Sequence, residues 1–410
     1  MNLANAIRSS VLLFSSVILL SACGGGSDSS NDPVTETLTG VFIDAPVEGL
    51  GYQTPNHQGK TNDKGEFTYD TGETVTFFFN GIDLGSAPAQ AKFPVTLLPN
   101  SPKLAQIFQT LDHNADPAKI DVSGITLDAG LKTQLTDLLA NKAGTPDLEA
   151  ILTNAKLAEL QTSNNVTLVN QSVVTEAEAA GHLSDNIDPI AMSASDFANK
   201  LFLDSDGGGI GSDIAVAAFY QNGTATFQGQ GDYGDYYNDS VTWSVSNDGT
   251  TNITFPDSST YVATKLSESD NRHIFHVTGG GDEEFIREFY EALPLSLADL
   301  NGKHFAIDTS DDEYCSATTL SFNGTNVTVN EQCTGGFDTF TVQAAEHDQL
   351  DNVIVFQAAE DNGDSSELHI ALIGGSLENG QYAEVEYDNS AIDHIGILRM
   401  AETDAPLTAQ

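Results

Sequence analysis

Residues 320–329 have the sequence LSFNGTNVTV, and a closely similar stretch, FYQNGTATF, occupies residues 219–227. In both, an Asn-Gly-Thr triplet stands between two short runs that mix apolar and polar residues. An Asn-Gly pair between such runs is typical of a β-hairpin, because both residues accept the positive φ that a tight turn needs. The two stretches therefore predict two hairpins, and their similarity indicates that part of the chain is repeated.

The sequence around these hairpins supports a duplication. DFANKLFLDS (196–205) aligns with DLNGKHFAIDTS (299–310) at an offset of 103, while the Asn-Gly-Thr triplets align at an offset of 101. We therefore expect two β units, at 190–293 and 294–402, each an antiparallel meander that forms a lipocalin-like barrel or a half-barrel. The stretch DEEFIREFYEAL (282–293) is predicted to be a connecting helix, with acids at its positive N-terminal end.

The region before the repeats begins with short alternating runs between Gly, Asn and Asp turns, over residues 39–98. The order DAPVEGLGY, then GKTNDKGEFTYDTGETVTF, resembles the transthyretin-like or carboxypeptidase-regulatory β modules of bacterial surface lipoproteins and adhesins. This resemblance implies a small β-sandwich. The whole chain is accordingly predicted to be mainly β with a helical subdomain.

The helical subdomain is expected after this module, so that β module and helical extension together span 39–184. Ser101-Pro102 predicts a helix start, with Ser101 as N-cap, and leucines at helical spacing predict a second helix over 127–138. A third is expected after Asp147, and Thr175 with Glu178 forms a capping-box pattern for a fourth.

The N-terminus carries an export signal. Arg8 precedes an apolar run of about ten residues, too short for a membrane-spanning helix, and Leu-Ser-Ala-Cys follows at 20–23. This motif resembles the lipobox of bacterial lipoproteins, which implies that residues 1–22 are removed and that Cys23 is lipidated and anchors the chain to a membrane. Residues 23–38 have the composition of a flexible tether. Gly24, where that family uses Asp for retention in the inner membrane, implies the outer membrane, with the periplasmic and surface faces both open.

The remaining two cysteines, Cys315 and Cys333, are predicted to form a disulfide, as expected for a pair in an exported chain. If Asn323-Gly324-Thr325 is a three-residue loop, Phe322 faces Asn326, and the same register places the two cysteines opposite each other. An isolated pair of thiols without nearby His residues does not indicate a zinc site.

The charge is strongly acidic: 59 Asp and Glu against 15 Lys and Arg give a net charge of −44. Residues 185–410 contribute 39 acids and six bases, a net of −33. Such a surface repels DNA, RNA and anionic lipid headgroups, so nucleic acid is excluded as a partner. It suits either adaptation to salty surroundings or recruitment of cations.

Two acidic loops are candidate Ca²⁺ sites, because alternating carboxylate and amide oxygens can wrap this ion. The first, LDHNADP, offers Asp112, Asn114 and Asp116, although Pro117 and Ser123 depart from the EF-hand pattern. The second, DSDGGGIGSD, contains one G-G-x-G-x-D match to calcium β-rolls. The alternative for both is a solvated acidic loop. The ligands of the second candidate would be Asp204, Asp206 and Asp213.

The sequence contains no G-x-S-x-G, H-E-x-x-H, P-loop or C-x-x-C motif, and its nine histidines are scattered. We therefore expect no enzyme and no cofactor other than Ca²⁺. The first functional hypothesis is a lipid-anchored envelope protein that binds a protein or glycan, as an adhesion or envelope-interaction module. The second is an accessory carrier whose repeats hold a lipid, fatty acid or hydrocarbon in a cup. Its expected lining, for which ordinary core packing is the alternative, is Phe202, Phe219, Trp243 and Phe305.

Overall fold

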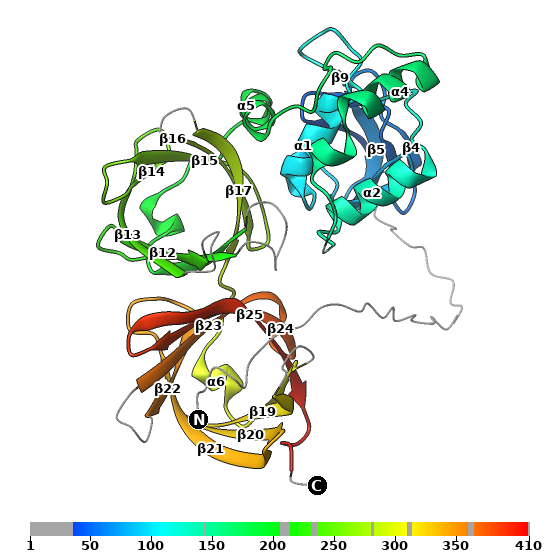
Figure 1. Cartoon of the computed structure of the whole chain (residues 1–410). Coiled ribbons are helices and arrows are strands. Elements are labelled where there is room, and N and C mark those ends of the chain that lie inside the picture. The colour runs from blue at the N-terminus through cyan, green and yellow to red at the C-terminus, as the bar shows by residue number, and fades with distance from the viewer. Residues whose placement is uncertain are drawn as a thin grey trace, which may run out of the picture.

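The computed structural model describes residues 36–142, 144–205, 214–230, 236–279, 283–309, 314–359 and 365–408. It shows a mainly β chain with three parts in sequence order: a mixed β and helical module followed by two closed antiparallel barrels (Figure 1). The expected fold class is confirmed. Both repeats are complete barrels, and neither is a half-barrel.

The first part contains two small sheets around a core of phenylalanines. Phe42, Phe67, Phe77 and Phe93 are at most 1% exposed, and Phe42 lies 4.7 Å from Phe77 between ring centroids. Phe42, Phe67 and Phe93 come from the three strands of one sheet and Phe77 from the other sheet, so the core lies between the two sheets. The first sheet has the order β5 (Glu66–Asp70), β1 (Thr37–Ile43), β8 (Lys92–Pro94). The second has the order β4 (Gln58–Lys60), β3 (Gly51–Gln53), β6 (Thr74–Phe79), β7 (Ile82–Pro88), and β2 (Val47–Glu48) pairs separately with β9 (Ile120–Asp121).

Helices follow where helical spacing predicts them. The capping box of the last helix is confirmed, with the Thr175 hydroxyl accepting from the Glu178 amide. Two details differ: Asn100, in the left-handed conformation, is the N-cap of the first helix, where Ser101 is predicted, and the third helix is split at Leu152–Thr153. The helical elements are η2 (Val95–Leu97), α1 (Ser101–Thr110), α2 (Ala129–Leu139), α3 (Leu148–Ile151), α4 (Asn154–Asn164) and α5 (Glu176–Asn186). None of the helices in the described ranges is long and apolar enough to cross a membrane.

The first barrel pairs each strand with the next in sequence and closes by pairing the last strand with the first. The connecting helix predicted at 282–293 is wrong, because residues 283–291 form the closing strand. Charged residues lie on both faces of this strand. Arg287 lies between Phe285 and Phe289 toward the barrel interior, and Ile286 lies between two glutamates on the opposite face, so polar and apolar residues do not alternate along the sequence. The strands are β10 (Lys200–Ser205), β11 (Ala215–Phe219), β12 (Thr224–Gln230), β13 (Tyr236–Val245), β14 (Thr251–Thr254), β15 (Thr260–Ser269), β16 (Arg272–Gly279) and β17 (Glu283–Glu291).

The second barrel repeats this arrangement. In both, a short helical turn with a Ser-x-x-Asp capping box precedes the first strand: Ser193 and Asp196 in η3 (Ala194–Asp196), and Ser296 and Asp299 in α6 (Leu297–Leu300). Figure 1 shows α6 within the ring of its barrel. The strands are β18 (His304–Ile307), β19 (Cys315–Asn323), β20 (Asn326–Cys333), β21 (Gly336–Glu346), β22 (Val353–Ala359), β23 (Ser365–Ser376), β24 (Asn379–Asp388) and β25 (Ala391–Thr403).

The seam between first and last strand is also the same in both barrels. Phe202 pairs with Glu291 across β10 and β17, and Phe305 pairs with Glu402 across β18 and β25. Two residues before each phenylalanine, a lysine bridges to that glutamate, with Lys200 Nζ 2.7 Å from Glu291 Oε1. The equivalent Lys303 to Glu402 distance is 3.0 Å. The matches that indicate the duplication therefore include the residues that close each barrel.

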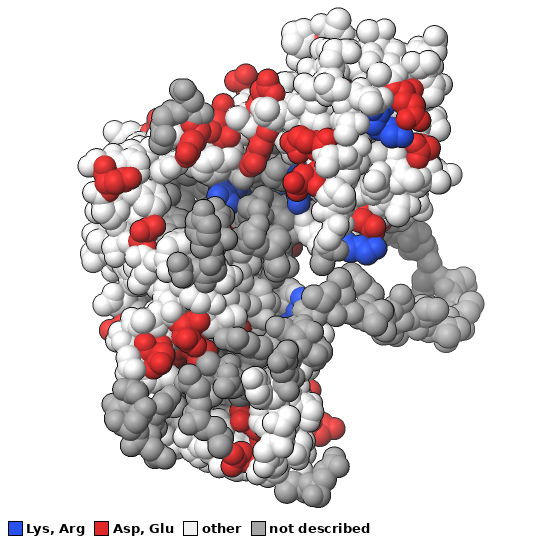
Figure 2. All heavy atoms as spheres, in the orientation of Figure 1, with Lys and Arg blue, Asp and Glu red and all other residues white. Residues whose placement is uncertain are grey.

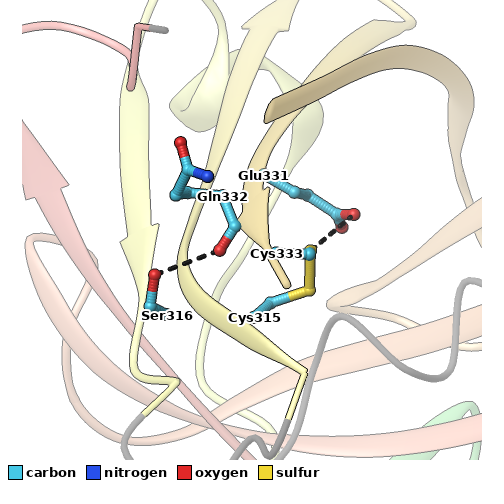
Figure 3. The surroundings of a disulfide bond; sticks show 5 residues. All are labelled: Cys315, Ser316, Glu331, Gln332 and Cys333. Atoms are coloured by element: carbon cyan, nitrogen blue, oxygen red, sulfur yellow. Dashed lines mark hydrogen bonds between the residues drawn. A yellow bond between two sulfur atoms is a disulfide. The ribbon is translucent and has the colours of Figure 1, made fainter. Parts of the chain in front are cut away.

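Cys315 and Cys333 form the predicted disulfide, shown in Figure 3 with Glu331 beside it. The predicted turn is wrong by one residue, since Asn323 pairs with Asn326 around a two-residue Gly-Thr loop. A β-bulge at Ser316 restores the predicted alignment before Cys315. The pairing prediction therefore succeeded because the bulge compensated for the shorter turn.

One hairpin tip of the first barrel, between β15 and β16, joins all three parts of the chain. Arg272 donates to the carbonyls of Thr96, at 2.7 Å, and Leu98, at 3.0 Å, in the helical module. Asn271 donates to the carbonyl of Ile373 in the second barrel at 2.8 Å. The first barrel is therefore anchored on both sides at this one end.

Candidate ligand cavity in the first barrel

The first barrel encloses a cavity of about 450 Å³. This volume falls in the range of roughly 300–1,000 Å³ that is usual for small-molecule sites. The walls are mainly aromatic, because the inward positions of most strands carry Phe or Tyr. The lining aromatic residues are Phe197, Phe202, Phe219, Phe227, Tyr237, Phe255, Tyr261, Phe275, Phe285 and Phe289.

Two inward positions of the first barrel carry smaller residues than their equivalents in the second. Phe202 pairs with Ala217 in the first barrel, whereas the equivalent Phe305 pairs with Leu320 in the second. One hairpin further, Phe219 faces Ala225, whereas Phe322 faces Val327. The second barrel thus carries larger apolar groups at positions where the first has methyl groups. Its interior is an apolar core that includes the fully buried Tyr382.

The floor of the cavity is built by the segment that follows η3. Phe197 is 5% exposed and lies 5.1 Å from Phe219 and 5.8 Å from Trp243, between ring centroids. The Trp243 indole nitrogen donates to the carbonyl of Thr224 at 2.9 Å, which fixes the ring at the closed end. The turns of β11–β12, β13–β14 and β15–β16 lie at this end, so the mouth is at the opposite end, beside the β14–β15 turn.

The mouth carries charged and hydroxyl groups above the aromatic walls. The Tyr261 hydroxyl donates to Glu283 Oε2 at 2.8 Å, and the Arg287 guanidinium lies 5.1 Å from the centre of the Phe285 ring. Asp257 accepts hydrogen bonds from the Ser259 hydroxyl and amide, which lower its pKa and keep it ionised. Asp204 and Asp239 complete the carboxylates that line the cavity.

Tyr237 lies over β12 at this mouth, and its ring has room only because residue 229 is glycine. A Cβ at Gly229 would be 2.3 Å from the Tyr237 hydroxyl oxygen. Burial, and then the negative charge of Asp204, raise the pKa of Tyr237, with Asp239 adding to this and Arg287 opposing it. The phenol therefore remains protonated and can donate a hydrogen bond.

The structure brings together part of the predicted lining. Phe202 and Phe219 line the cavity, while Trp243 lies in the floor beneath it and Phe305 belongs to the core of the second barrel. Sequence reasoning missed the other eight aromatic residues of the lining, which include Phe227 on β12, Tyr237 on β13 and Phe255 after β14. The signal was present in Phe285, Arg287 and Phe289 at period two, but the helix prediction concealed it.

The first predicted calcium loop folds onto itself through local hydrogen bonds. Asp112 Oδ1 accepts from the amides of Asn114, at 2.9 Å, and Asp121, at 2.8 Å, and burial raises the pKa of Asp112. Asn114 Oδ1 accepts from the Asp116 amide, and Asp116 Oδ1 accepts from the Ala118 amide. Calcium binding here stays a prediction.

Calcium binding at the second predicted site also stays a prediction. Asp204 lies in β10 and lines the cavity mouth, while Asp206 and Asp213 lie outside the described residues. Cys23, the predicted lipidation site, also lies outside them, as do the signal peptide and all but the end of the tether.

Two polar clusters in the first part were not predicted. His57, Asp70 and Glu73 lie close enough to share a metal ion, but Asp70 already accepts from His57, Thr37 and Asn56, and Glu73 accepts from two backbone amides. His182 on α5 contacts the fully buried Asp44 at 3.1 Å, and this hydrogen bond raises the pKa of His182. Both clusters hold backbone segments together.

Comparison with protein-family models and with curated proteins finds no match for this chain. The cavity is therefore interpreted from its own residues.

Proposed function

We propose that this chain is a binding protein whose first barrel holds a small hydrophobic or amphipathic ligand. The observation that carries the proposal is the aromatic cavity of about 450 Å³ in the first barrel. Of the two functions expected from the sequence, it favours the accessory carrier. Binding needs no catalytic group, in keeping with the expectation of a non-enzymatic protein.

The predicted lipobox adds a proposed location, the outer membrane, to this function. Lipidation at Cys23 would tether the barrel to the outer membrane, where hydrophobic molecules need carriers between lipid surfaces. Incorporation of labelled palmitate into the wild-type chain, and its loss in Cys23→Ser, would support the anchor. An unlabelled wild-type chain would contradict it. A role in adhesion or in binding an envelope protein or glycan remains the alternative proposal.

The neutral dye N-phenyl-1-naphthylamine, which fluoresces in apolar surroundings, tests for the ligand site. We expect saturable binding to the soluble chain from residue 24, with one site per molecule. Ala263→Leu should weaken it about tenfold or more, because Ala263 lines the cavity and the added side chain would fill part of it.

Val262→Leu is a matched control, since it adds bulk on the same strand at the neighbouring position, which faces away from the interior. It should leave dye affinity within about twofold of wild type. Absence of saturable binding, or equal losses in the two variants, would contradict the proposal.

A further inference from the structure

We propose that the natural ligand of the first barrel is an organic cation, with an apolar or aromatic body and a positively charged amine or quaternary ammonium group. The inference rests on the proposed binding function and adds the chemical class of the ligand. The apolar body would occupy the aromatic interior, and the cationic group would lie at the mouth.

The mouth has more negative than positive groups. Asp204, Asp239, Asp257 and Glu283 line the cavity together with a single base, Arg287. A cavity with low-dielectric walls and acidic residues at its opening attracts cations and repels anions. A carboxylate or phosphate headgroup would have to approach against this charge.

Arg287 does not cancel the excess of negative charge at the mouth, because two of the lining carboxylates lie near the same tyrosine hydroxyl as its guanidinium. The charges of Asp204, Asp239 and Arg287 all act on the hydroxyl of Tyr237. The Arg287 guanidinium itself lies over the Phe285 ring. The described partners of Asp257 and Glu283 are hydroxyl and amide groups, so neither carboxylate is paired with a described cation.

The aromatic rings below the mouth also favour a cation. Phe227, Phe255 and Tyr261 follow one another around the wall, with ring centroids 6.1 and 5.6 Å apart in that order. The Phe285 ring, 6.3 Å from Tyr261, already carries Arg287 over it. Ring faces attract cations through their quadrupole, by about 0.5–2 kcal/mol each, and aromatic cages bind quaternary ammonium groups in this way. A cation entering this mouth would meet carboxylates first and ring faces next.

The surface of both barrels reinforces the preference. Residues 185–410 carry 39 acids and six bases, and on the face seen in Figure 2 acidic side chains outnumber basic ones. The resulting long-range field raises the local concentration of cations and falls with ionic strength.

The test is displacement of bound N-phenyl-1-naphthylamine by three amphiphiles with the same twelve-carbon chain, each below its micellar concentration. Dodecyltrimethylammonium should displace the dye at a concentration at least about tenfold lower than dodecanoate, with 1-dodecanol between them. Raising the salt concentration from 50 to 500 mM should weaken the ammonium compound and leave dodecanol almost unchanged.

Charge-removing variants test whether the carboxylates at the mouth cause the preference for a cationic ligand. The double variant Asp257→Asn, Glu283→Gln removes two charges and keeps acceptors for Ser259 and Tyr261. It should weaken dodecyltrimethylammonium about tenfold while leaving dodecanol within about twofold. Equal displacement by all three amphiphiles would overturn the inference and leave the proposed function standing. Tightest binding of dodecanoate, lost in Arg287→Gln, would overturn it in favour of an anionic ligand. Failure of the dye itself to bind would contradict the proposed function.

Discussion

Arg272 offers the sharpest test of how the first barrel is held to the rest of the chain. Its guanidinium forms an ion pair with Glu288, which is fully buried, and donates to two carbonyls of the helical module. Glu288 also accepts from the Tyr290 hydroxyl at 3.0 Å. The change Arg272→Met keeps most of the side-chain volume but leaves the Glu288 carboxylate buried without its cation.

The expected cost follows from that uncompensated charge. Removing one partner of a buried ion pair destabilises a protein by about 3–5 kcal/mol. The double variant Arg272→Met, Glu288→Gln removes the charge and retains an acceptor for Tyr290. It should lose only the hydrogen bonds to the Thr96 and Leu98 carbonyls, about 1–3 kcal/mol. The second substitution should therefore restore about 2 kcal/mol.

Trp243 makes the measurement specific, because it is the only tryptophan of the chain and lies in the first barrel. Denaturant unfolding followed by its fluorescence gives the free energy of each variant. Lys200→Met is a matched control in the same barrel, since Lys200 and Glu291 are each about one quarter exposed and such pairs contribute roughly 0–1 kcal/mol. A double variant as unstable as the single, or a single no worse than the control, would refute the reasoning.

Three further predictions concern other parts of the chain. Reducing the Cys315–Cys333 disulfide, which spans 18 residues, should lower the free energy of unfolding by about 3 kcal/mol, measured with and without reductant; an unchanged midpoint would contradict this. Because Asp44 raises the pKa of His182 above 6.5, the stabilisation from their contact should be complete below pH 6.5 and be lost as pH rises through the folded-state pKa. His182→Gln should flatten that part of the stability–pH curve, and a curve identical to wild type would refute the assignment. Phe197→Ala should cost about 3 kcal/mol and shift Trp243 emission to longer wavelength, because it opens the cavity floor; unchanged emission would argue against this packing.

Sequence patterns predicted those elements whose signals are local. The capping box at Thr175 is formed by residues three apart, and the duplication is visible because both seams use Lys and Phe at equal spacing. The strand β17 was missed because charged residues fall on both of its faces: Arg287 faces the cavity, and Glu288 is buried on the other face by its ion pair with Arg272. The acids at 282–284 also resemble the start of a helix.

The cavity could not be predicted because it depends on register. Ala217 and Leu320 hold equivalent places only by virtue of their pairing with Phe202 and Phe305, which a sequence alignment alone does not establish. The hairpin offsets illustrate the difficulty, since the change from 103 to 101 corresponds to a turn two residues longer between Phe219 and its Asn-Gly-Thr triplet. Equivalent inward positions of the two barrels can be compared only after this change of offset in the alignment is known.

The described interiors of the two barrels differ in a few inward side chains. The second, which also has a disulfide, carries Leu320 and Val327 in its core where the first has Ala217 and Ala225, and the first encloses a cavity. A hollow barrel forgoes packing that would otherwise stabilise it. Contacts outside the first barrel offset this: Leu266, Ile274 and Ile286 join the core of the helical module, and a separate apolar cluster joins the barrels to each other. The polar anchors at Asn271 and Arg272 lie at the closed end, and Gln228 and Tyr387 join the two barrels nearer the mouth.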